Sequence, residues 1–104
     1  MDKEIRKMYV VTILPDYIEP VVWGEYKAVR ADSMGWGILG VDNEPYGYFS
    51  DRLMYNVEPH PSIHSNGRYV IRGFDKIKIK TAWNKYVDDF SNKAAILNNF
   101  KFPL

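Results

Sequence analysis

The stretch VVWGEYKAVRADSMGWGILGVDNEPYGYFSDRLMYNV, residues 21–57, decides the fold. Its first ten residues alternate, so that Glu25 and Lys27 point to one side and the residues around them to the other, as in a half-buried strand. Tight turns are predicted at residues 32–35 and 42–45, where Asp, Asn, Gly and Pro gather. The predicted elements are strands at 21–30, 36–41 and 46–49, one helical turn at 50–52 and a last short strand at 53–57.

The order of motifs in this stretch resembles the SH3-like barrel. Trp36 follows an acidic turn, Gly47-Tyr48-Phe49 comes next, and Ser50-Asp51-Arg52 then leads into Leu53-Met54. The family has a Trp-bearing strand, a Gly-aromatic strand, a one-turn helix and a final strand in that order. Its acidic-aromatic motif is missing here, and Ser50 stands where it has a proline. The resemblance therefore implies a small barrel without the polyproline groove.

The flanking sequence completes one α+β domain over residues 1–104. Residues 8–14 are apolar on both faces, which predicts a central strand. Residues 68–72 and 76–80 predict two more strands, the second with Ile77 and Ile79 inward. A helix is predicted over 81–100, capped by Thr81, with an apolar face of Trp83, Val87, Phe90, Ala94 and Leu97 widened by Tyr86 and Phe100. The expected fold is a small, bent antiparallel sheet or SH3-like barrel with this single C-terminal amphipathic helix packed on it.

The composition predicts a cytoplasmic globular domain. The 104 residues include no Cys and no apolar run long enough to span a membrane, and the net charge is +1. The charge is unevenly distributed: residues 16–65 carry three bases and eight acids, a sum of −5, and residues 66–104 carry eight bases and three acids, a sum of +5. The two parts are expected either to neutralise each other or to form patches of opposite sign.

The motifs of enzymes and metal proteins are missing from the sequence. It contains no phosphate-binding loop, no nucleophile elbow and no His-Glu-x-x-His. His60 and His64 have a metal-like spacing, but Pro61 between them disfavours the helix on which that spacing would work. We therefore expect no catalytic residue, no cofactor and no metal.

The aromatic content of 15% exceeds what a small core needs and favours a protein-binding module. In style the chain resembles small phage accessory proteins, which implies an inhibitor that binds and blocks a host protein. The predicted partner-binding residues are aromatic and acidic: Trp23, Trp36, Asp42, Glu44, Tyr46, Tyr48, Asp51 and Tyr55.

Two alternatives remain open at the level of sequence. The first is nucleic-acid binding through the basic residues Arg68, Arg72, Lys76, Lys78, Lys80 and Lys85, with Trp83 or Tyr69 stacking on bases. The simpler interpretation of the lysines is that they protect a strand edge from unwanted pairing. The second alternative is a homodimer that associates through the helix or an open strand edge.

Overall fold

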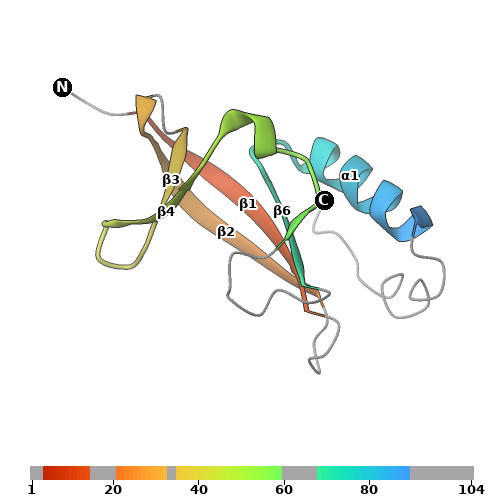
Figure 1. Ribbon diagram of the computed structural model, residues 1–104. Coiled ribbons are helices and arrows are strands. Elements are labelled where there is room, and N and C mark those ends of the chain that lie inside the picture. The colour runs from red at the N-terminus through yellow and green to blue at the C-terminus, as the bar shows by residue number, and fades with distance from the viewer. Residues whose placement is uncertain (1–3, 15–20, 33–34, 60–67, 90–104) are drawn as a thin grey trace.

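The fold is a curled antiparallel sheet with one helix packed against it. The computed structural model describes residues 4–14, 21–32, 35–59 and 68–89. The sheet has the strand order β4-β3-β2-β1-β6-β5, and Figure 1 shows α1 beside β6, at the opposite end of the molecule from β3 and β4. The elements are β1 Ile5–Ile13, β2 Val21–Arg30, β3 Trp36–Leu39, β4 Pro45–Phe49, the 3₁₀ turn η2 Asp51–Leu53, β5 Glu58–Pro59, β6 Tyr69–Gly73 and α1 Lys76–Asp89.

Strand β1 is central, as its sequence predicts, because both of its faces are apolar. It pairs with β2 along its whole length and with β6 over its second half. Met8 and Val10 are buried on one face, and Val11 and Ile13 are buried on the other. Each set belongs to a separate hydrophobic cluster, so β1 separates the two halves of the core.

The first cluster lies between the sheet and α1, on what we call the outer face. Val11, Ile13 and Ile71 project from β1 and β6. Opposite them, α1 contributes the buried side chains Ile79, Trp83, Tyr86 and Val87. Burial of Trp83, Tyr86 and Val87 confirms part of the predicted apolar face; its remaining members lie outside the described residues.

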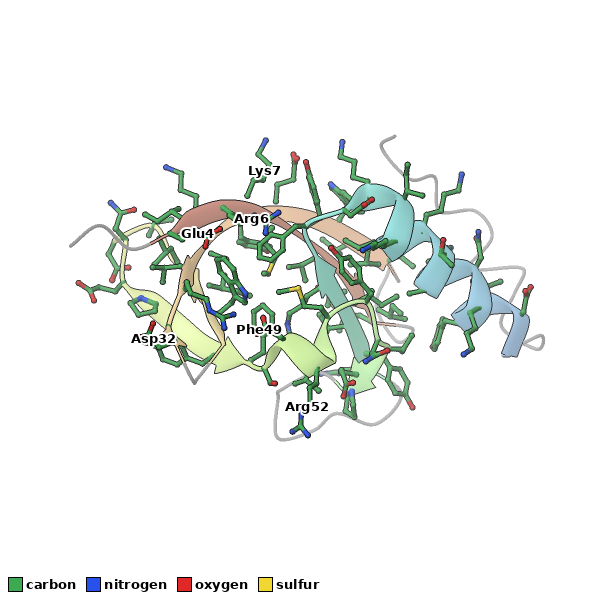
Figure 2. All side chains as sticks on the ribbon, turned by 90° about the horizontal axis from the view of Figure 1, so that it is seen from above. Glu4, Arg6, Lys7, Asp32, Phe49 and Arg52 are labelled. Carbon is green, nitrogen blue, oxygen red and sulfur yellow. The ribbon has the colours of Figure 1, made fainter. Side chains whose placement is uncertain are left out.

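The second cluster fills the inside of the curl, on the inner face. Met8, Val10 and Val70 from the central strands meet Trp36 and Phe49 from β3 and β4. Figure 2 shows Phe49 inside the curve of the sheet and Lys7 pointing away from it. The chain is therefore a half-barrel with a core on both sides of its central strand.

The predicted strand over residues 76–80 is wrong, because these residues form the first turns of α1. The Asp75 carboxylate caps this helix, accepting hydrogen bonds from the backbone N–H groups of Ile77 at 2.9 Å and Lys78 at 3.3 Å. Thr81 is not the cap; its hydroxyl donates to the Ile77 carbonyl one turn earlier. Ile79 is fully buried, whereas Ile77 is 71% exposed, although both were expected to face inward.

The predicted strand over residues 53–57 is also wrong. Leu53 ends η2, and Tyr55 adopts a left-handed backbone with φ of 60°, which interrupts any strand. The pairing resumes at β5, within what the sequence predicts as a loop over residues 58–67. His60 and His64 lie outside the described residues.

Candidate binding surfaces

The predicted aromatic and acidic residues do not share one surface. Trp36 is buried on the inner face at 5% exposure, whereas Trp23 packs with the cluster beneath α1 on the outer face. Asp42 and Glu44 lie in the exposed turn between β3 and β4, and Tyr48 is exposed on β4. Only the backbone of Tyr46 is described, also in β4. The turn and β4 therefore bring one part of the predicted set together.

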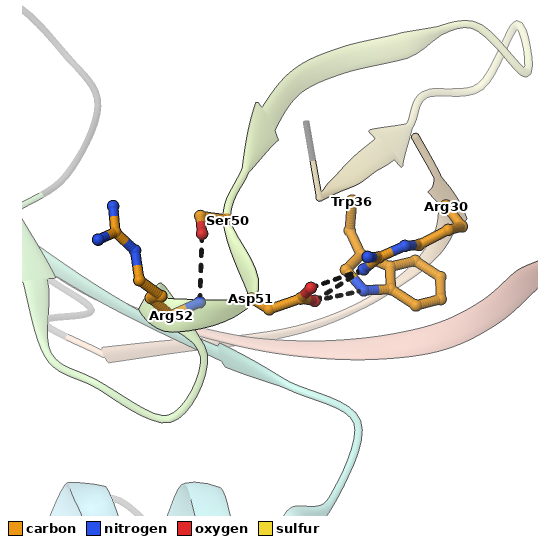
Figure 3. Close-up of polar contacts among 5 residues, drawn as sticks. All are labelled: Arg30, Trp36, Ser50, Asp51 and Arg52. Carbon is orange, nitrogen blue, oxygen red and sulfur yellow. Dashed lines mark hydrogen bonds and ion pairs between the residues drawn. The ribbon is translucent and has the colours of Figure 1, made fainter. Parts of the chain in front are cut away.

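Asp51 is held in a polar cluster that fastens η2 to the sheet (Figure 3). One guanidinium nitrogen of Arg30 donates to both carboxylate oxygens at 2.8 Å, and the Trp36 indole N–H donates to one of them at 3.0 Å. The hydrogen bond from Arg30 lowers the pKa of Asp51, supported by the charge of Arg30 and the Trp36 bond against a smaller effect of desolvation. The Asp51 carboxylate thus holds the backbone of η2 against β2 and β3, and this structural role explains why an Asp stands in the turn.

Tyr55, like Asp51, positions the backbone, in this case at the start of α1. Its hydroxyl accepts hydrogen bonds from the backbone N–H groups of Phe74 at 2.9 Å and Asp75 at 3.0 Å. Its ring lies where a side chain on Gly73 would project. Tyr55 therefore joins the segment after η2 to the junction between β6 and α1.

Part of the outer face is not covered by α1. The helix packs on the end that carries Val11 and Ile13, while the other end presents five apolar residues, which we call the bare face: Ile5, Val29, Leu39, Pro45 and Tyr48. Strand register places these residues side by side, because Ile5 pairs with Val29, and Val29 with Gly37, which in turn pairs with Tyr48. Ile5 is 57% and Tyr48 46% exposed, Leu39 and Pro45 are half-buried, and Val29 is buried at the floor; all five line one groove.

The bare face borders an open sheet edge. Among the described strands, β4 pairs with β3 alone, so its other side is the end of the sheet. Its sequence, PYGYF, carries no charge, whereas proteins commonly guard such edges with lysine. Two features of β4, Pro45 at its start and a register shift opposite Gly37 and Ile38, limit how regularly it can pair.

A second groove runs past η2 and the start of α1, and it shares Arg6 and Arg30 with the groove of the bare face. Four cations that line it each lie over an aromatic ring, so we call it the cation–aromatic groove; its volume is about 1160 Å³. The distances from cation to ring centroid are 4.1 Å for Arg6 on Phe74, 5.5 Å for Arg30 on Trp36, 5.2 Å for Lys76 on Tyr9 and 5.4 Å for Lys78 on Tyr55. Glu4, Asp51 and Asp75 also line it.

The predicted basic residues are divided between this groove and other places. Lys76 and Lys78 are in the groove, and Lys80 and Lys85 are exposed along α1. Arg72 points into the half-barrel, with its guanidinium 4.8 Å from the Phe49 ring centroid, and burial lowers its pKa. Arg68 directly precedes β6. Arg6 was missed, because it stands in a mixed-charge segment far from the other bases in sequence.

Within residues 4–14, 21–32, 35–59 and 68–89, no three His, Cys, Asp or Glu side chains gather as metal ligands would. In the same ranges, no helix is long and apolar enough to cross a membrane. Comparisons with protein-family models, with curated proteins and with solved structures gave no match to this chain. Its function is therefore argued from its surfaces.

Proposed function

We propose that this protein is a non-enzymatic binding module that recognises a protein partner through the β4 edge and the bare face. In this mode an extended segment of the partner adds to the edge of the sheet, and its side chains contact the neighbouring face. Main-chain hydrogen bonds would supply affinity, and the apolar residues beside the edge would supply selectivity.

The observation that carries the proposal is the unequal covering of the outer face. At one end α1 packs on the sheet and leaves Val11 and Ile13 with no exposed surface. At the other end Ile5 and Tyr48 keep about half of their surface in water. Contiguous apolar surface beside an unguarded edge is typical of interaction sites, and burying the exposed part of each such side chain contributes on the order of 1 kcal/mol.

The proposal keeps part of the surface predicted from the sequence. Tyr48 is on the bare face, and Asn43 and Glu44 from the adjoining turn line the same groove. The groove is also bordered by Lys7, Glu25 and Lys27, so its rim offers charges of both signs. A polar rim around an apolar centre is the usual composition of a protein interface.

Two more specific assignments, the SH3-like barrel and the phage-type inhibitor, are also proposals. An SH3-like barrel is supported by the 3₁₀ turn η2, which follows β4, and by the position of β1 between β2 and β6. A role as a phage-type inhibitor of a host protein is supported only by the style of the sequence. In that role the captured partner would lose its activity when the module is bound.

Affinity capture with matched variants tests the proposed function. The immobilised protein is incubated with bacterial lysate beside two variants. Tyr48→Lys places a charge on the bare face, and Ile77→Lys places one at an apolar residue on α1 that is more exposed than Tyr48. We expect a stoichiometric partner on the wild type and on Ile77→Lys, and its loss from Tyr48→Lys. An absent partner, or one held equally by both variants, would refute the proposed function.

A further inference from the structure

The cation–aromatic groove has chemistry that protein binding at the bare face does not use. Arg6 projects from β1, while Lys76 and Lys78 project from the first turn of α1, so residues distant in sequence converge there. In Figure 2, Arg6 lies on the inner side of the sheet, opposite to Lys7. Arg6 and Arg30 also line the groove of the bare face, whereas Phe74, Lys76 and Lys78 line the cation–aromatic groove and not that one.

The cations of the groove are positioned mainly by rings. Arg30 forms an ion pair with Asp51. Arg6 and Lys78 instead contact Phe74 and Tyr55. A ring face orients a cation without using its N–H donors, which leaves those donors available for an anion.

The carboxylates of the groove are largely engaged in structural bonds. Asp51 accepts from Arg30 and Trp36, and Asp75 accepts from the first N–H groups of α1. Glu4 is the remaining acid in the lining. The lining holds four cations and three carboxylates, a net charge of +1, and one carboxylate, Asp51, is paired with Arg30.

The shape and the aromatic content favour a polymer with planar groups. A volume of about 1160 Å³ exceeds that of a typical small-molecule pocket, and the groove is open along the surface. Arg6, whose guanidinium lies 4.1 Å from the Phe74 ring centroid, offers a plane on which a base can stack, while the lysines can contact phosphates. Exposed bases are needed for such stacking, which disfavours a paired duplex.

We propose that the cation–aromatic groove binds single-stranded nucleic acid, with Arg6, Lys76 and Lys78 each contacting one phosphate and the guanidinium plane of Arg6 also stacking on a base. Three phosphate contacts on a single strand predict a slope of about −2 for the logarithm of the association constant against the logarithm of salt concentration. Affinity would then fall roughly 20-fold between about 50 and about 200 mM salt.

Fluorescence anisotropy with a labelled oligothymidine of about 15 nucleotides, long enough for a site of this type, tests the proposal. The variants are Arg6→Gln and Lys78→Gln, and the control is Lys27→Gln, which removes the same charge from an exposed position on the outer face. We expect each groove variant to weaken binding and to reduce the slope by about 0.7, while Lys27→Gln leaves both unchanged. Lys78 is exposed on α1, so its variant tests the groove without disturbing the core.

Several results would overturn the proposal. These are no binding at low salt, binding that is insensitive to salt, or equal weakening by Lys27→Gln, which would indicate general charge attraction. A duplex of the same length that binds as tightly would contradict the single-strand assignment. Displacement of the oligonucleotide by an equal charge of polyglutamate would instead indicate a site for acidic proteins.

Discussion

Replacing Tyr55 by Phe tests how the half-barrel is joined to α1. The substitution keeps the ring that lies over Gly73 and removes only the hydroxyl oxygen. That oxygen accepts two backbone hydrogen bonds, from Phe74 at 2.9 Å and Asp75 at 3.0 Å. It is thus one acceptor for two donors at the point where β6 ends and the helix begins.

The expected loss follows from those two donors. A buried N–H group that loses its partner costs about 1–3 kcal/mol, and a partly exposed one costs less because water can replace the acceptor. Phe74 is half-buried and Asp75 is exposed. The free energy of unfolding should therefore fall by about 1–2 kcal/mol. With a urea m-value of about 1.5 kcal/mol/M, the midpoint should fall by about 1 M.

Urea unfolding followed by tryptophan fluorescence measures the change, with Tyr48→Phe as the control. Tyr48 is 46% exposed on the bare face, so losing its hydroxyl should change stability by less than about 0.5 kcal/mol. If Tyr55→Phe shifts the midpoint no more than Tyr48→Phe does, the hydroxyl does not hold this junction and the reasoning is refuted.

Three further substitutions test other parts of the fold. Ile79→Ala should lower the free energy of unfolding by about 2–5 kcal/mol, whereas Ile77→Ala should change it by less than about 0.5; equal losses in chemical denaturation would contradict the helical register. The pKa of Asp51 is lowered by its bond to Arg30, so the carboxylate stabilises the fold above its ordinary value of 3.8, and this contribution is lost as pH falls through the lower folded-state value. The stability difference between wild type and Asp51→Asn should therefore narrow below about pH 4 in a denaturation series, and a gap that widens there would count against the pair. Gly35→Ala should destabilise by more than about 1 kcal/mol in thermal melts, because φ is 90° and the new methyl group would meet a backbone carbonyl; an unchanged melting temperature would exclude that geometry.

Local patterns predict most of the half-barrel because its strands are short and their turns are marked by specific residues. The alternation over residues 21–30 coincides with β2, and the helical turn at Ser50-Asp51-Arg52 is within one residue of η2. The apolar run of residues 8–14 correctly indicates a central strand. In each case the deciding signal lies within the element itself.

The start of α1 could not be predicted in the same way. KIKIK over residues 76–80 alternates like an edge strand, but Ile79 and Trp83 are also one helical turn apart. A run of five residues fits the repeat of a strand as well as that of a helix. The helix is selected by the Asp75 cap and by the packing of Ile79 in the same core cluster as Ile71. Tertiary contacts therefore override the local pattern.

The binding surfaces depend on strand register, which the sequence does not state. Trp23 and Trp36 were expected on one surface, yet the pairing of β1, β2 and β3 places them on opposite faces. The groove needs Arg6 from β1 to meet Phe74 after β6, a contact that exists only once both strands are in the sheet. Sequence alone identifies the kinds of residue present and leaves their grouping undetermined.

The central claim is that α1 covers one end of the outer face and leaves the other end exposed. Methyl NMR with a soluble paramagnetic probe measures this directly, because relaxation increases where a methyl group meets solvent. We predict strong enhancement at Ile5 and protection of Ile13, Ile71 and Ile79, which have no exposed surface. Ile5 as protected as Ile13 would contradict the bare face and, with it, the binding surface proposed for this protein.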